Sequence, residues 1–185
     1  TRLAAQAIGS LDVIAVAGGD GTLNSVVNGL LSAGARRGAQ ELPAVGLIPF
    51  GTGNCAAKAF NIPCDMEGAI EVIARGKAVE MDVGVVKPCT VHGAQCTVFL
   101  LWLGAGLDGA VIHAVEGARR GAIGAGIFHY ALPIARAALA YPFPPMSVEV
   151  DGAAMPSGVR QVIVANVGGT AALLDVAPDA DPSDG

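Results

Sequence analysis

The sequence predicts an α/β protein in two parts: a parallel α/β N-terminal domain over residues 1–80, then an antiparallel β-sandwich domain with a helical insert over residues 81–185. Two observations predict this class. Near the N-terminus, two short apolar runs are each followed by glycines and then by apolar residues at helical spacing. Beyond residue 80, strand-like segments separated by turn residues take over.

Residues 12–17 (DVIAVA) form the first predicted strand. The run is apolar and β-branched without alternation, which is typical of a parallel strand buried on both faces. Apolar residues then recur at helical spacing over residues 23–31, so a helix follows the glycines. Residues 1–10 are expected to be the end of an earlier helix.

Residues 43–49 (PAVGLIP) form the second predicted strand, and residues 56–60 a short helix after its glycine turn. Asp65 is expected to cap a further helix that reaches residue 74, and Gly76 to end it.

In the second part, strands are expected over residues 79–86, 95–103, 147–150 and 160–167, with a hairpin turn at Asp151-Gly152. The mostly helical insert covers residues 108–140. Its apolar part, residues 123–141, is expected to pack in the core or to help hold a lipid tail.

Composition excludes several classes of protein. Hydrophobic residues make up 52% of the chain and charged residues 15%, which excludes a disordered protein. The net charge is −5 without a basic stripe, so no nucleic-acid partner is expected. The four cysteines lack zinc-site spacing, and no apolar run reaches the roughly 18 uncharged residues that a membrane span needs.

Both ends of the chain look cut. Thr1 stands within an expected helix and Gly185 directly after a turn signal, so both domains are expected to be truncated at these ends.

Residues 18–24 (GGDGTLN) are the clearest candidate site. Glycines let the backbone approach a phosphate, and the amides at the start of the next helix bind anionic oxygens. A carboxylate within such a loop repels phosphate unless Mg²⁺ or a proton neutralises it, so Asp20 suggests catalysis. A plain tight turn with Asp20 as a helix cap is the simpler alternative. The loop has neither the Walker A nor the dinucleotide-binding pattern, so hydride transfer has no support.

Residues 49–54 (PFGTGN) are the second candidate. At the end of a neighbouring parallel strand, this loop would face the first one across the carboxyl edge of the sheet. The two loops together predict a nucleotide cleft.

Six ordered motifs resemble the diacylglycerol kinase catalytic-domain family, and most closely its bacterial lipid kinases, which sphingosine and ceramide kinases also resemble. They are GGDGTLN (18–24), FGTGN (50–54), MDVG (81–84), GAGLDG (104–109), NVGG (166–169) and APDA with the following DG (177–185).

The resemblance implies an NAD-kinase/diacylglycerol-kinase-like nucleotide-binding domain that phosphorylates a lipid hydroxyl with ATP and Mg²⁺. Asp20 would lie near the metal and the transferred phosphoryl group, and Asp184 would supply or neighbour the general base. The implied nucleotide contacts are Gly18, Gly19, Gly21, Thr22, Leu23, Asn24, Gly51, Thr52, Gly53 and Asn54.

Two departures from the family pattern keep alternatives open. Ser25 stands where the family commonly has Glu, and Cys55 where it commonly has Asp. Loss of two carboxylates is compatible with a degenerate nucleotide- or lipid-binding module without turnover. An NAD kinase-like small-molecule kinase is a second alternative, because such enzymes also resemble GGDGT.

The partners expected from the resemblance are a lipid with a hydroxyl group and, transiently, a membrane surface. The protein is expected to be cytoplasmic and peripheral to the membrane, with a homodimer left open.

Overall fold

The computed structural model describes residues 6, 8–9, 11–37, 42–88, 96–119, 128–168, 170–171, 174–175 and 177–185. The chain divides into two compact units. The first comprises Thr1–Leu101 and Ala165–Gly185, and the second comprises Trp102–Val164. The domain division after residue 80 stays a prediction.

The first unit is built on a parallel strand pair. β1 (Val13–Gly18) lies beside β2 (Ala44–Pro49), with Val13 opposite Ala44 and Gly18 opposite Pro49. The two strands therefore end together, and the glycine turns that follow them begin at the same edge, as the sequence predicts.

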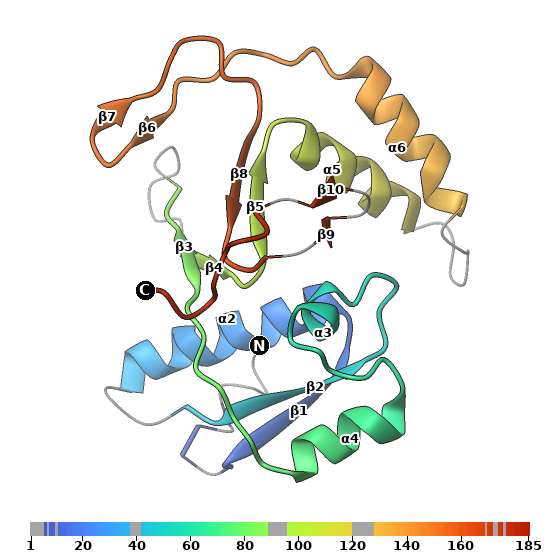
Figure 1. The fold of residues 1–185 in the computed structure, drawn as a ribbon, viewed down its shortest axis with the longest axis vertical. Coiled ribbons are helices and arrows are strands. Elements are labelled where there is room, and N and C mark those ends of the chain that lie inside the picture. Colours follow the sequence, from blue (N-terminus) through green and yellow to red (C-terminus); the bar gives the residue numbers. More distant parts are fainter. Residues whose placement is uncertain are drawn as a thin grey trace. The chain divides into compact units, whose positions relative to one another are not determined.

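Helices lie on both faces of this pair (Figure 1). Val45 and Leu47 pack toward α2 (Asp20–Arg37). A Cβ on the intervening Gly46 would lie 2.7 Å from Ile73 of α4 (Met66–Ala74). Because side chains alternate across a strand, α2 and α4 cover opposite faces. A short helix, α3 (Cys55–Ala59), follows the second glycine turn.

β1 differs from the strand buried on both faces that its composition predicts. Val16 is buried, but Val13, Ala15 and Ala17 are exposed. Of the two helices, α2 packs on β1 and α4 packs on β2, which leaves one face of β1 uncovered in the described part of the chain.

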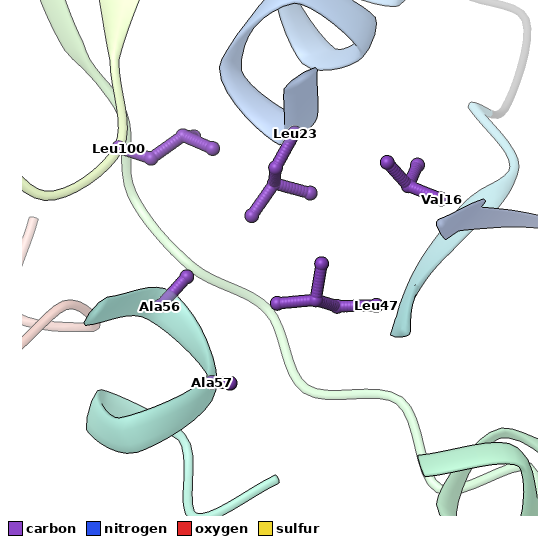
Figure 2. Packing of buried hydrophobic residues seen from close by; sticks show 6 residues of the cluster. All are labelled: Val16, Leu23, Leu47, Ala56, Ala57 and Leu100. Atoms are coloured by element: carbon purple, nitrogen blue, oxygen red, sulfur yellow. The ribbon is translucent and has the colours of Figure 1, made fainter. Parts of the chain in front are cut away.

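The core lies between the strand pair, α2 and α3. Leu23 of α2 packs with Val16 and Leu47 of the strands, while Ala56 and Ala57 bring α3 close (Figure 2). Leu23 directly follows the first glycine turn, so burying its side chain holds the start of α2 against the sheet.

The predicted cap of α4 is confirmed. The Asp65 carboxylate accepts a hydrogen bond of 2.8 Å from the amide of Gly68, and Gly76, at a φ of 66°, follows the end of the helix.

Two hairpin-like strand pairs complete the first unit. β3 (Gly84–Val86) pairs with β4 (Thr97–Phe99), and β9 (Thr170–Ala171) with β10 (Leu174–Asp175), both antiparallel. The Asn28 side chain holds β4 to α2, because it donates to the Val98 carbonyl and accepts from the Val98 amide.

The strand predicted over residues 79–86 is shorter in the structure and begins at Gly84. Asp82 donates its amide to the Pro182 carbonyl, and its own carbonyl accepts from the side chain of Asn166. Its backbone groups are thus satisfied by loop segments instead of a strand ladder.

The second unit combines a strand pair with helices. β5 (Trp102–Ala105) lies beside β8 (Val162–Ala165), α5 (Leu107–Arg119) packs on β5, and α6 (Phe128–Ala140) packs on α5. These helices confirm the helical insert. None of the helices in the described ranges has the length and apolar character that a bilayer-spanning segment requires.

β6 (Glu149–Val150) and β7 (Ala153–Ala154) form the predicted hairpin. Asp151 and Gly152 between them have φ values of 51° and 79°, as a type I′ turn requires. The described strands form two-stranded pairs, and the β-sandwich stays a prediction.

Candidate functional site

Two glycine turns meet at the carboxyl edge of the parallel pair. The amide of Phe50 donates to the Gly18 carbonyl at 3.0 Å, which extends the strand ladder by one residue into the turns. This edge is where open α/β sheets bind their ligands.

The turns touch backbone to backbone at Gly19 and Gly51. A Cβ on Gly19 would lie 2.9 Å from the Gly51 Cα, and a Cβ on Gly51 would lie 2.5 Å from the Gly19 Cα. Backbone atoms yield little, so this close approach requires glycine at both positions.

The carboxylate of Asp20 joins the two turns. Its Oδ2 accepts from the Cys55 amide at 3.0 Å, and its Oδ1 accepts from the Ala56 amide at 2.8 Å. These are amides of the first turn of α3. Asp20, itself the first residue of α2, therefore caps the next helix along the chain, a partner that sequence reasoning missed.

The left-handed conformation of Asn54 explains why this cap comes from another turn. Asn54 occupies the N-cap position of α3 at φ 47° and ψ 45°, and its side chain makes no cap hydrogen bond. Instead its Oδ1 accepts from the Gly51 amide at 2.8 Å, which closes the second turn on itself.

Nine of the ten predicted nucleotide contacts fall into two groups, and Asn24 is described below. Leu23 is buried, and Gly18, Gly19, Gly51 and Asn54 are partly buried at the junction of the turns. Four residues are exposed on the outer side: Gly21, Thr22, Thr52 and Gly53. A Cβ on Gly21 would meet nothing within 4 Å, so packing does not explain this glycine.

Asn24 carries a buried polar atom without a partner. Within the described part of the chain, its Oδ1 is the single buried side-chain nitrogen or oxygen that lacks a hydrogen bond. A buried amide without a partner costs stability, and such groups in folded proteins call for an explanation such as a ligand or water.

The site offers a metal ion one carboxylate. No group of three or more His, Cys, Asp and Glu side chains that could hold a metal occurs among residues whose placement is described. Mg²⁺ is commonly held by one or two carboxylates together with substrate phosphates and water. Asp20, with one amide on each oxygen and lone pairs remaining, fits that kind of site.

Asp184 lies where three of the predicted motifs, MDVG (81–84), NVGG (166–169) and the late APDA…DG (177–185), are hydrogen-bonded to one another. The Gly185 amide donates to Asp82 Oδ2 at 2.8 Å, and Asn166 Nδ2 donates to the carbonyls of Asp82 and Leu100. The Gly168 amide binds the Ala180 carbonyl. The late motifs therefore hold one another around an exposed Asp184. Among the described residues, Asp184 makes no hydrogen bond to Asp20 or to either glycine turn.

Three comparisons with known proteins agree. Residues 1–86 match the diacylglycerol kinase catalytic domain family. The chain is 45% identical over 73 residues to diacylglycerol kinases of Staphylococcus aureus strains JH9 and Newman, over 40% of this chain and 21% of each relative. The match to this family is confined to residues 1–86, and residues 87–185 lie outside it.

Solved structures share the fold. A diacylglycerol kinase from Bacillus anthracis str. Sterne superposes with a TM-score of 0.59 at 24% identity, over 90% of this chain and 49% of that one. A second candidate diacylglycerol kinase from the same organism gives 0.67 at 22% identity, over 100% and 57%. The chain thus spans about a fifth of the curated relatives' length and about half of the solved chains.

The two residues that depart from the diacylglycerol kinase pattern, Ser25 and Cys55, lie in different surroundings. Ser25 is exposed on α2. Cys55 stands at the junction, and burial together with the negative charge of Asp20 raises the pKa of its thiol, against a weaker lowering by Lys58. The hydrogen bond to Asp20 comes from the Cys55 backbone, so the side chain found there does not determine it.

Beyond the matched residues 1–86, Asp108 does not cap α5 by itself. Its carboxylate accepts from Gln161 Nε2 at 2.6 Å, while Gln161 Oε1 accepts from the Leu107 amide at 2.7 Å. His113 is exposed; His92 and the side chain of His129 lie outside the described residues.

Two glycines provide a matched test of the junction. Gly51→Ala should lower the free energy of unfolding by about 1–3 kcal/mol, because the added Cβ overlaps the Gly19 backbone. Gly21→Ala should leave stability unchanged or higher, because its Cβ enters open space. Urea denaturation followed by circular dichroism measures both. Equal stabilities for the two variants would contradict the close approach of the turns.

Cys55 reports the charge beside it. Asp20→Asn keeps an oxygen acceptor for the α3 amides but removes the charge that raises the pKa of the thiol. At pH 8 the thiolate fraction should rise, and iodoacetamide should alkylate Cys55 faster than in the wild type. Peptide mass spectrometry gives the rates, with the exposed Cys64 and Cys96 as internal controls that should not change. An unaltered rate at Cys55 would show that Asp20 does not lie beside it.

Proposed function

We propose that this protein is an ATP- and Mg²⁺-dependent lipid kinase that binds ATP between the two glycine turns. The observation that carries the proposal is the Asp20 carboxylate, which sits at the junction of the turns and is held there by the amides of Cys55 and Ala56. A carboxylate fixed beside exposed glycines suits a site that receives phosphate together with a cation.

The α2 terminus is proposed to bind the phosphates. It presents backbone amides and the positive end of a helix dipole, which favour anions. The exposed residues Gly21 and Thr22 are proposed to lie along the phosphates, and Thr52 and Gly53 to contact the nucleotide from the facing turn. Asn24 Nδ2 is proposed to donate to the same phosphates, whereas the buried Oδ1 of this side chain can only accept a hydrogen bond.

Asp20 would hold Mg²⁺ together with the nucleotide phosphates, and the ion would neutralise charge on the transferred group. The residues of the chain supply the rest. The turns are proposed to orient the γ-phosphate, and Asp184 to accept the proton of the lipid hydroxyl. The hydroxyl oxygen then bonds to the γ-phosphorus while the bond from this phosphorus to ADP breaks, so that ADP leaves.

The acceptor is proposed to be a lipid because the curated relatives are diacylglycerol kinases. Its water-insoluble tails would bring the protein to a membrane surface. The alternatives are the NAD kinase-like enzyme and the degenerate binding module. The exposed Ser25 and the thiol of Cys55, in place of carboxylates, are the features that favour the degenerate module.

Phosphoryl transfer tests the proposal. The acceptors offered are four lipids (diacylglycerol, sphingosine, ceramide and phosphatidylglycerol) and, as a non-lipid, NAD. We expect label from γ-labelled ATP with Mg²⁺ to enter one of the lipids. Asp20→Asn should lower the rate by roughly 10²-fold or more, because groups that stabilise developing charge are worth that much. Gly21→Ala should weaken ATP binding, because its Cβ occupies the proposed phosphate position.

The control is Gly109→Ala, which also adds a Cβ to an exposed glycine in the first turn of a helix with nothing within 4 Å. It should bind ATP as the wild type does. Label in NAD alone would assign the protein to the NAD kinase-like class. Folded protein that binds ATP without transferring label would favour the degenerate module.

A further inference from the structure

Asn28 of α2 binds strand β4 as a neighbouring strand would. Its Oδ1 accepts from the Val98 amide at 2.8 Å, and its Nδ2 donates to the Val98 carbonyl at 2.9 Å. Two residues paired across an antiparallel ladder exchange these same two hydrogen bonds. Nδ2 also donates to the Asn24 carbonyl at 2.9 Å, and Oδ1 also accepts from the Thr97 hydroxyl at 3.0 Å. Both donors and both acceptor positions of the amide are therefore used, which fixes the side chain.

Asn166 attaches the end of β4 to the segment before β3. Its Nδ2 donates to the Leu100 carbonyl at 2.8 Å and to the Asp82 carbonyl at 2.9 Å. Its backbone amide donates to the Leu101 carbonyl at 2.8 Å. Leu100 directly follows β4, so Asn28 and Asn166 hold the same stretch of chain, one from α2 and the other from the NVGG motif. We call the side chains of Asn28 and Asn166 the asparagine clamps.

Asp82 continues the connection to Asp184, the proposed general base. The Asp82 amide donates to the Pro182 carbonyl at 2.7 Å, and Asp82 Oδ2 accepts from the Gly185 amide at 2.8 Å. Asp184 stands between these two points of attachment. Within the described part of the chain, no hydrogen bond of residues 182–185 reaches either glycine turn. The hydrogen bonds on both sides of Asp184 lead to Asp82 instead.

Core packing brings the same segments together but does not fix them as narrowly. The buried side chain of Leu100 belongs to the same apolar cluster as Leu23, which follows the first glycine turn (Figure 2). Apolar contacts are non-directional, so they tolerate small sliding movements. The asparagine clamps bind individual backbone groups, and such hydrogen bonds weaken steeply when their geometry is lost. The clamps therefore define the register of β4 against α2.

Phosphoryl transfer would depend on this register. A general base acts when it lies within hydrogen-bond reach of the hydroxyl that it deprotonates, and that hydroxyl must also face the phosphate. Asp20 and Asp184 stand on separate segments, and no hydrogen bond joins them among the described residues. The asparagine clamps link α2, which begins at Asp20, to the segment that carries Asp184.

We infer that Asn28 and Asn166 are positioning residues, which place Asp184 to accept the proton of the lipid hydroxyl. The inference rests on the proposed function, since Asp184 is the base proposed there. It deepens that function by naming the residues that set the position of the base. Asn28 binds Asn24 at the backbone carbonyl, so a change at Asn28 leaves the proposed phosphate contacts in place.

Steady-state kinetics with Asn28→Asp and Asn166→Asp tests the inference. Each change keeps the size of the side chain but replaces the donor Nδ2 by an oxygen that faces carbonyls, so the clamp opens. We expect kcat to fall by about tenfold or more, because a misplacement of about 1 Å can cost about 10²-fold. The KM and the calorimetric Kd for ATP should change by less than about twofold, because ground-state binding is kept. Unchanged kcat, or a loss of ATP affinity as large as the loss of kcat, would overturn the inference.

The matched control is Asp65→Ala, which removes one hydrogen bond of 2.8 Å between a side chain and the backbone of the same compact unit. It should lower stability but leave kcat unchanged well below the unfolding temperature. An equal fall in kcat for this control would overturn the inference, because loss of stability alone would then account for it. Circular dichroism checks folding. Where an Asp variant does not fold, the Ala variant at the same position, which removes the donor without adding repulsion, is measured in its place.

A double-mutant cycle with Asp184→Asn shows whether the asparagines act through Asp184. In that background the proton acceptor is already lost, so Asn28→Asp and Asn166→Asp should each lower kcat further by less than about twofold. Multiplicative losses would overturn the inference. Full activity of Asp184→Asn would overturn it together with the proposed role of Asp184, whereas label transfer that still requires ATP and Mg²⁺ would leave the kinase standing.

NMR separates the inference from the proposed function, because it needs no turnover. Asn28→Asp should shift the amide resonances of Asp184 and Gly185, to which Asn28 makes no hydrogen bond, and Asp65→Ala should leave them unchanged. Unchanged resonances in Asn28→Asp would overturn the inference even in an active kinase. Shifted resonances in a protein that transfers label to no acceptor would reject the kinase, while the placement of Asp184 by the asparagine clamps would stand.

Discussion

The hydrogen bonds from α3 to the Asp20 carboxylate are the interaction on which the candidate site depends. One carboxylate oxygen accepts a hydrogen bond from the Cys55 amide and the other from the Ala56 amide. A residue of the first glycine turn therefore caps α3, the helix that follows the second glycine turn. A helix cap contributes about 0.5–2 kcal/mol. Here the cap also fixes the position of the two turns relative to one another, because its donor and acceptor are 35 and 36 residues apart in sequence.

The packing around that contact explains why the sequence is so restricted there. Gly19 and Gly51 allow the backbones to meet, and burial of Leu23, Ala56 and Ala57 holds both helices against the strand pair. These residues build the junction, whereas exposed Gly21 and Gly53 are not required by it and remain available to a ligand. A loop motif can thus contain residues with two different physical reasons for being there.

Much of the first unit could be predicted because its signals are local. Apolar runs followed by glycines located β1 and β2, and the cap of α4 followed from Asp65 alone. The capping of α3 by Asp20 could not be predicted, because it depends on the left-handed Asn54 that turns its own side chain back to Gly51. The short β3 could not be predicted either, because the backbone of Asp82 just before it binds the distant residues Pro182 and Asn166. The exposure of β1 depends on which helices pack against it, and one of its faces is left uncovered.

The central claim, that Asp20 ties the two turns into one site, is tested most directly by amide hydrogen exchange measured by NMR. In the wild type, the amide hydrogens of Cys55 and Ala56 should exchange more slowly than amide hydrogens in the first turn of a helix usually do. In Asp20→Ala both should exchange faster, while the amide of Gly68, which Asp65 caps in the same way, should not change. If Cys55 and Ala56 exchange at the same rates in both proteins, the carboxylate does not hold α3, and the account of the site is wrong.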